Sequence, residues 1–186
     1  MSDKMVNGIL FIIGGLGSIA VYMGLGETGL LDKGHTEKIA AYGLVTIPLA
    51  FMMTRNVEKN AFIKVQTYID AGLLMMVVGL SMGLVSDAIN SAESDSIGEA
   101  IAWTGWSIMY LGISITGIGY LRTNLFPNWL SSLLLLTSFV MFAFLATSSP
   151  EQLSNNGDDI VPPLWMINSL VLVILGIFTI RRAELD

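Results

Sequence analysis

The strongest constraint on this chain is a series of long apolar runs that recur along its 186 residues. A helix needs about 20 apolar residues to cross a bilayer core that is roughly 30 Å thick. Runs with few or no charged residues that meet or approach this length occur six times, at residues 5–26, 39–54, 65–86, 100–121, 128–148 and 163–180. We therefore predict an all-α fold, an integral membrane six-helix bundle in which residues 1–186 form a single transmembrane domain.

Composition agrees with a chain that is solvated mainly by lipid. Only 13% of its residues are charged, whereas a soluble domain carries about 25%. The net charge of −6 gives no basic surface for nucleic acid. We expect a multi-pass protein of the cell membrane whose partners are the lipid bilayer and, in addition, other membrane proteins or a second copy of itself.

The second run is the weakest candidate for a span. It has 16 uncharged residues, bracketed by Lys38 and Arg55, whose charged ends can reach the headgroups. Pro48 lies inside it and is expected to kink or loosen the helix, because proline lacks a backbone N–H. A bundle of five spans is the alternative.

The basic residues predict the orientation of the bundle. If six spans alternate, the two termini and the second and fourth loops share one side, and that side holds Lys4, Arg55, Lys59, Lys64, Arg122, Arg181 and Arg182. The opposite side holds only Lys33 and Lys38. Because cytoplasmic loops are enriched in lysine and arginine, this asymmetry predicts that both termini are cytoplasmic.

The ends of the spans carry aromatic residues and polar linkers. Trp103, Trp106 and Trp165 fall near outer span ends, as expected for an interfacial aromatic belt. The outer linkers 86–99 and 149–160 have the composition of loops, and we expect Pro162 and Pro163 to start the last span.

Asp70 is the single acidic residue inside an apolar run. A charge in the membrane is costly and by default marks a functional site, although Asp70 lies only six residues beyond Lys64, roughly 9 Å along a helix. Gln66 and Thr67 share its face. One interpretation is a proton- or ion-binding carboxylate at the end of an inner vestibule. The favoured one is a carboxylate that points into the bundle and anchors helix packing by pairing with Arg122.

Small and polar residues within the runs indicate helix packing. Gly79 and Gly83 form a G-x-x-x-G pattern, and Gly14 and Ser18 repeat the spacing; such residues let helices approach closely in lipid. Three polar side chains on one face of the fourth run either line a cavity or bond within the bundle. They are Ser107, Tyr110 and Ser114. Asn168 is expected to face another helix.

Missing residue types exclude several kinds of chemistry. The chain has no cysteine and a single histidine, His35, so a thiolate metal site or a haem held by two histidines cannot form. No run contains the lysine that a retinal Schiff base requires, and Asp70 has no second carboxylate within a span. We expect no catalytic residues, no metal and no cofactor.

The segment Gly117–Leu136, GIGYLRTNLFPNWLSSLLLL, resembles part of an uncharacterised family of small prokaryotic multipass membrane proteins, the domain of unknown function 4386 type. The resemblance rests on the Pro127, Trp129 and Leu130 pattern that starts a span, and on the VPPLW segment at 161–165. It is best over the last three spans. It implies the six-span layout and transfers no activity or site.

Two functions are consistent with these observations. The first, which the sequence favours, is a structural or accessory protein that acts through helix–helix interactions. The second is a small transporter or channel that uses Asp70. A membrane enzyme or sensor is a third class, but the sequence contains no recognisable catalytic pattern.

Overall fold

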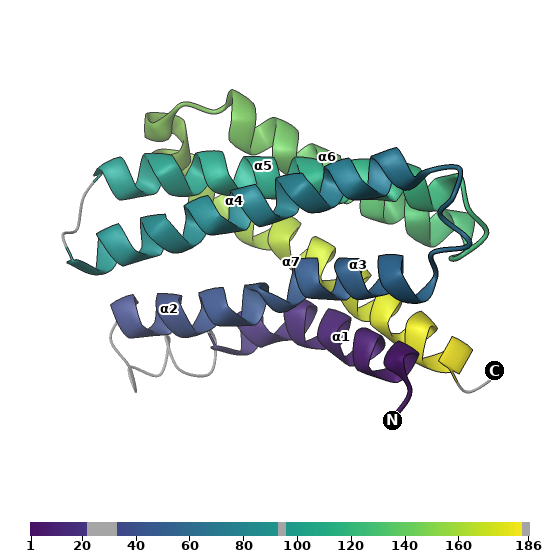
Figure 1. The fold of residues 1–186 in the computed structure, drawn as a ribbon. Helices are drawn as coiled ribbons and strands as arrows, with labels where there is room; N and C mark the ends of the chain where they lie inside the picture. Colours follow the sequence, from purple (N-terminus) through teal and green to yellow (C-terminus); the bar gives the residue numbers. More distant parts are fainter. Residues whose placement is uncertain (22–32, 93–95, 184–186) are drawn as a thin grey trace.

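All elements in the described part of the chain are α-helices, and no strand occurs there, which confirms the predicted all-α fold (Figure 1). The computed structural model describes residues 1–21, 33–92 and 96–183. The helices are α1 (Asp3–Val21), α2 (Lys33–Leu44), α3 (Thr46–Val57), α4 (Gln66–Ala92), α5 (Ser96–Leu121), α6 (Asn128–Thr147) and α7 (Pro150–Ala183).

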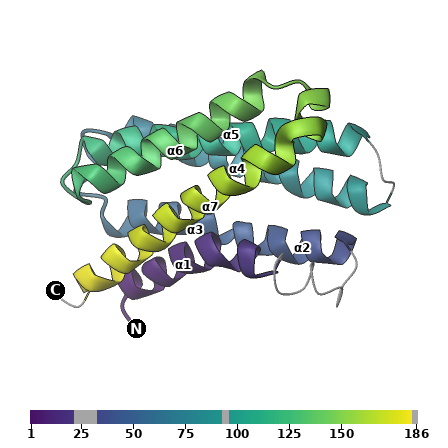
Figure 2. The same ribbon diagram turned by 180° about the vertical axis from the view of Figure 1, so that it is seen from behind.

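Successive helices run in opposite directions along one bundle, except that α3 continues in the direction of α2 (Figure 1). Both termini lie at the same end, together with the α3–α4 and α5–α6 connections (Figures 1 and 2). We call this the terminal end and the opposite one the far end. Helices α4, α5 and α6 form one layer, α1, α2 and α3 form another, and α7 crosses between them with contacts to α6 and α1 (Figure 2).

Five helical segments are long and apolar enough to cross a membrane: Asp3–Val21, Gln66–Ile89, Gly98–Leu121, Asn128–Thr147 and Ile160–Arg182. They overlap five of the six expected spans, although residues 22–26 of the first lie outside the described residues. Five such helices indicate a multipass membrane protein.

The expected second span is divided into α2 and α3, which are too short individually to cross a bilayer. The division falls at Val45, whose φ of −58° and ψ of −27° remain helical. Pro48 explains the break, because it offers no N–H to the carbonyl four residues earlier. The hydroxyl of Thr46 donates to the carbonyl of Gly43 at 2.7 Å. Figure 1 shows α3 following α2 along the bundle. The interruption at Val45, three residues before Pro48, agrees with the expected kink or loosened turn.

The prediction that residues 149–160 form a loop is wrong, since α7 already begins at Pro150 and contains Pro162 and Pro163 in its interior. A capping box starts this helix. The Ser149 hydroxyl accepts from the Gln152 N–H at 3.2 Å, and the Gln152 side chain accepts from the Ser149 N–H at 2.9 Å. These two bonds satisfy N–H groups that a helix start leaves unpaired. Similarly, α4 and α5 extend into the expected 86–99 linker.

Glycines allow close contact in two helix pairs. Between α4 and α5, a Cβ on Gly79 would clash with the backbone of Gly105 and Met109, and a Cβ on Gly105 would lie 2.8 Å from the Gly79 carbonyl. Between α1 and α7, a Cβ on Gly8 would lie 2.6 Å from the Gly176 carbonyl. Backbones this close gain packing contacts that lipid cannot replace.

Aromatic side chains fill the core at the terminal end. Phe51 meets Phe11 edge-on with ring centroids 5.0 Å apart, and Phe62 stacks on Tyr120 at 5.6 Å. Phe126 lies 5.2 Å from Tyr120. Because these rings come from α1, α3, α5 and the two connections at this end, they join both layers of the bundle.

Candidate functional site

Asp70 on α4 forms a two-pronged ion pair with Arg55 on α3. Arg55 Nε donates to Oδ1 at 2.5 Å, and Arg55 Nη2 donates to Oδ2 at 3.3 Å. The Asp70 side chain is 42% exposed and the Arg55 side chain is 35% exposed. The carboxylate therefore lies at the edge of the bundle where α3 meets α4, and does not point into the interior as we expected.

The cation beside Asp70 is Arg55 and not Arg122, the partner that we had expected from the sequence. Arg122 instead lies over the ring of Tyr68, 4.9 Å from its centroid. From the sequence, we placed Arg55 at this end of the bundle but did not expect it to pair with Asp70. Its position 15 residues before Asp70, across the short α3–α4 connection, was the available signal.

Gln66 and Thr67, the polar neighbours of Asp70 on α4, are exposed on the outer surface of the helix. The buried face of α4 consists of other residues, among them Ile69, Leu73 and Met76. The polar face that contains Asp70 is thus directed away from the core and lines no internal vestibule among the described residues.

Glu58 is the centre of a second charged cluster at the terminal end, which we did not expect from the sequence. Its carboxylate lies 3.4 Å from Lys4 Nζ of α1 and 2.9 Å from Arg182 Nη2 of α7. Arg182 also donates from Nη1 to the carbonyl of Leu125 at 3.2 Å. This acidic residue therefore ties both terminal helices to the α3–α4 and α5–α6 connections.

Two asparagines form polar contacts between helices. Asn168 of α7 faces α6, as expected: its Oδ1 accepts from the hydroxyls of Ser138 (2.9 Å) and Thr137 (3.1 Å), and its Nδ2 donates to the Thr137 carbonyl (3.2 Å). Asn7 of α1 is 1% exposed, and its amide lies 2.7 Å from the Thr54 hydroxyl of α3. In each case a buried amide finds its partners on a neighbouring helix.

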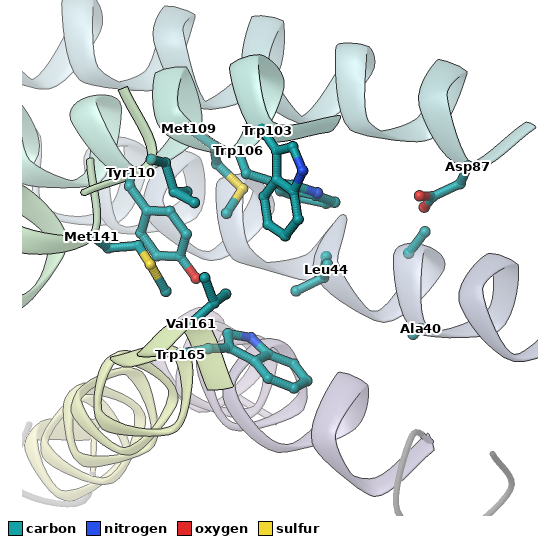
Figure 3. Close-up of a pocket in the computed structure, with 12 residues that line it drawn as sticks. Ala40, Leu44, Asp87, Trp103, Trp106, Met109, Tyr110, Met141, Val161 and Trp165 are labelled. Atoms are coloured by element: carbon teal, nitrogen blue, oxygen red, sulfur yellow. The ribbon is translucent and has the colours of Figure 1, made fainter. Parts of the chain in front are cut away.

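A cavity of about 240 Å³ separates the two layers near the far end (Figure 3). Twelve described residues line it, from helices α2, α4, α5, α6 and α7: Ala40, Ala41, Leu44, Asp87, Trp103, Trp106, Met109, Tyr110, Met141, Leu145, Val161 and Trp165. The lining is mostly apolar and rich in aromatic rings. This composition is typical of a small-molecule site.

Tyr110 provides a polar group inside this cavity. Its side chain is 7% exposed, and Figure 3 shows its hydroxyl directed into the space between Trp103 and Trp165. The hydroxyl forms no hydrogen bond with any residue of the described ranges. Ser107, on the same helix face, donates instead to the Thr104 carbonyl at 2.8 Å and is not part of the lining.

The three tryptophans that we assigned to the interfacial belt also line this cavity. The signal was present in the spacing of Trp103, Trp106 and Tyr110, because residues three and four apart lie on one helical face. Sequence alone could not tell whether that face pointed to lipid or to the interior.

The small residues predicted to pack helices lie at different interfaces. Gly79 and Gly83 face α5, and Gly14 faces α3, where an added Cβ would lie 2.6 Å from Ile47. The Ser18 side chain lies outside the described part of the structure.

Comparison with known proteins gives no assignment, since the chain matches no family model, no curated protein and no solved structure. Within the described residues, no group of three or more His, Cys, Asp or Glu side chains could hold a metal ion.

Proposed function

We propose that this chain is a multipass protein of the cell membrane with both termini in the cytoplasm, and that it acts as a structural or accessory protein through helix–helix contacts rather than by catalysis. The resemblance to the uncharacterised multipass family fits this proposal and adds no activity.

The observation that carries the proposal is the pairing of Asp70 with Arg55. A carboxylate held by a guanidinium through two hydrogen bonds is charge-compensated and fixed in position. Such a pair links α3 to α4, and it leaves no vacant negative charge for a transported proton or cation. The transporter interpretation depended on that vacant charge.

Other polar groups in the spans support the same function. The amides of Asn168 and Asn7 join α6 to α7 and α1 to α3, respectively. Hydroxyls of Thr116 and Thr179 bond to carbonyls of their own helices. Polar side chains used in this way stabilise a bundle and do not form a path across it.

Basic residues at the terminal end support the proposed orientation. Lys4 lies at the start of α1, Arg55 near the end of α3, and Arg122 and Arg182 at the ends of α5 and α7. Figure 1 shows these helix ends at the terminal end of the bundle. Reporter fusions after residue 186 and in the 93–95 connection test it. We expect a cytoplasmic signal from the first and an external signal from the second. The reverse pattern contradicts the orientation.

Flux measurements test the accessory role against transport. The chain and its Asp70→Asn and Arg55→Gln variants are reconstituted in proteoliposomes at equal folded yield, and proton and cation fluxes are measured. We expect no flux above that of empty vesicles from any of them. A flux that Asp70→Asn abolishes while the protein stays folded contradicts the accessory function.

The partner is tested by the mass of the complex extracted in mild detergent. Light scattering on the purified complex gives its protein mass, and we expect a value above that of one chain of 20.1 kDa. A strictly monomeric particle that retains no other protein contradicts a role through helix–helix contacts.

A further inference from the structure

The volume of the far-end cavity is sufficient for one substituted six-membered ring and too small for a whole lipid molecule. Sites for drug-sized ligands measure about 300–1,000 Å³, so the 240 Å³ available here holds one substituted ring. Any long chain attached to that ring has to lie outside the cavity. The site belongs to neither the Asp70–Arg55 pair nor the Glu58 cluster.

The lining favours a flat, uncharged ligand. Three indole rings and one phenol ring offer planar surfaces on which another ring can stack. None of the twelve described lining residues is lysine, arginine or histidine, so an anionic headgroup finds no cation among them. Asp87 lies at the edge of the cavity in Figure 3 and already interacts within the protein, which makes it a poor counter-charge for a bound cation.

The polar groups of the site define what the ligand has to present. Tyr110 is 7% exposed, and its hydroxyl is directed into the cavity and forms no hydrogen bond with a described residue. A ligand that fills the cavity shuts this hydroxyl off from water, so it has to offer the hydroxyl a hydrogen-bond partner. The indole N–H groups of Trp103 and Trp106 also bond to no described residue, and an indole N–H can only donate. The matching ligand therefore carries acceptor oxygens on its ring.

We propose that this cavity binds the ring of a neutral lipophilic quinone, with the ring between the indoles and a carbonyl oxygen accepting from the Tyr110 hydroxyl. A quinone ring is planar and uncharged and carries two acceptor carbonyls, and its alkyl chain is soluble in the surrounding bilayer. The proposal concerns binding alone.

Tryptophan fluorescence tests this proposal directly. Three of the four tryptophans line the cavity, and the fourth, Trp129, is 51% exposed in α6, which begins at the terminal end. In a Trp129→Phe background, all indole emission therefore reports on the cavity. The probe is decylubiquinone, titrated into the protein in nanodiscs. Decyltrimethylammonium and decanoate serve as cationic and anionic probes with a matched chain length.

We expect saturable quenching by decylubiquinone that neither charged probe prevents. Tyr110→Phe removes one neutral hydrogen bond and should weaken binding about three- to tenfold. Ala41→Leu fills the cavity and should abolish saturation, with folding checked by circular dichroism and the melting temperature. If Ala41→Leu does not fold, the change in quinone affinity in Tyr110→Phe tests the proposal by itself.

Two results overturn the proposal. Quenching that is linear in quinone concentration and equal in the parent and Tyr110→Phe proteins shows partition into lipid only. Prevention of quenching by decyltrimethylammonium, or saturable binding of that probe in place of the quinone, shows that the cavity selects an organic cation.

Discussion

The indole of Trp106 on α5 lies directly against the backbone of Gly83 on α4. A Cβ built on Gly83 would be 2.8 Å from ring carbon Cζ2 of Trp106, closer than such atoms can pack. The second glycine of the G-x-x-x-G pattern therefore does more than bring two helices together. It sets the position of one wall of the far-end cavity.

We predict that Gly83→Ala displaces Trp106 and destabilises the protein. Overpacking of a tight contact costs about 1–3 kcal/mol, and the displaced ring should also shift the tryptophan emission. Thermal unfolding in detergent measures the first effect and fluorescence measures the second.

Gly17→Ala is the matched control for this substitution. A Cβ on Gly17 would meet only Ile13, at an ordinary 3.6 Å. Because alanine is the better helix former by about 1 kcal/mol, this variant should be as stable as the parent or more stable. Equal stability losses in both variants would contradict the contact between Gly83 and Trp106.

The Arg55–Asp70 pair should show energetic coupling. Arg55→Gln and Asp70→Asn each remove one charge of the pair and disrupt its two-pronged hydrogen bonding, so each should lower the melting temperature. The double variant should lose clearly less than the sum of the two single losses. The exchanged pair, Arg55→Asp with Asp70→Arg, should recover part of the loss.

Arg122→Gln combined with Asp70→Asn is the control for this cycle, because Arg122 contacts Tyr68 and not Asp70. Their effects should add. If Arg122 shows the coupling and Arg55 does not, the assignment of the ion pair is wrong.

Asn168→Ala should loosen the contact between α6 and α7. The substitution leaves the Ser138 hydroxyl, which is fully buried, without its partner. Since hydrogen bonds between membrane helices contribute modestly, we expect a loss of about 0.5–2 kcal/mol in the free energy of unfolding. Thr147→Ala is the comparison, because the exposed Thr147 hydroxyl bonds only to Ala143 of its own helix. A larger effect from Thr147→Ala would refute the interhelical role of Asn168.

Glu58→Gln should free both terminal helices at once, because one carboxylate serves Lys4 and Arg182. This cluster is partly exposed, so we expect a cost of about 1–3 kcal/mol, between the values for surface and buried pairs. Amide hydrogen exchange in the first turn of α1 and the last turn of α7 should become faster. Glu99→Gln, an exposed carboxylate on α5, should leave those rates unchanged. Unchanged exchange in Glu58→Gln would exclude this link.

Most of the helical layout could be predicted from the sequence because it depends on local properties. The length of an apolar run decides whether a helix can span a bilayer, and the missing N–H of Pro48 decides where the second span breaks. The early start of α7 was also readable, since Ser149 and Gln152 have capping-box spacing. We nevertheless predicted a loop there, because the segment is rich in polar residues.

The partners of the polar and aromatic side chains were decided only by the tertiary structure. Several cations lie at the same end of the bundle as Asp70, among them Arg55, Lys64 and Arg122. Distance along the sequence does not show which of them pairs with Asp70. The packing of α3 against α4 brings Arg55 Nε to 2.5 Å from the Asp70 carboxylate. The sequence places Trp106 near the end of a span, but only the packing of α5 against Gly83 turns its ring toward the cavity. Hydropathy fixes how deep a residue lies in a membrane, whereas the direction in which its side chain points depends on contacts with helices distant in sequence.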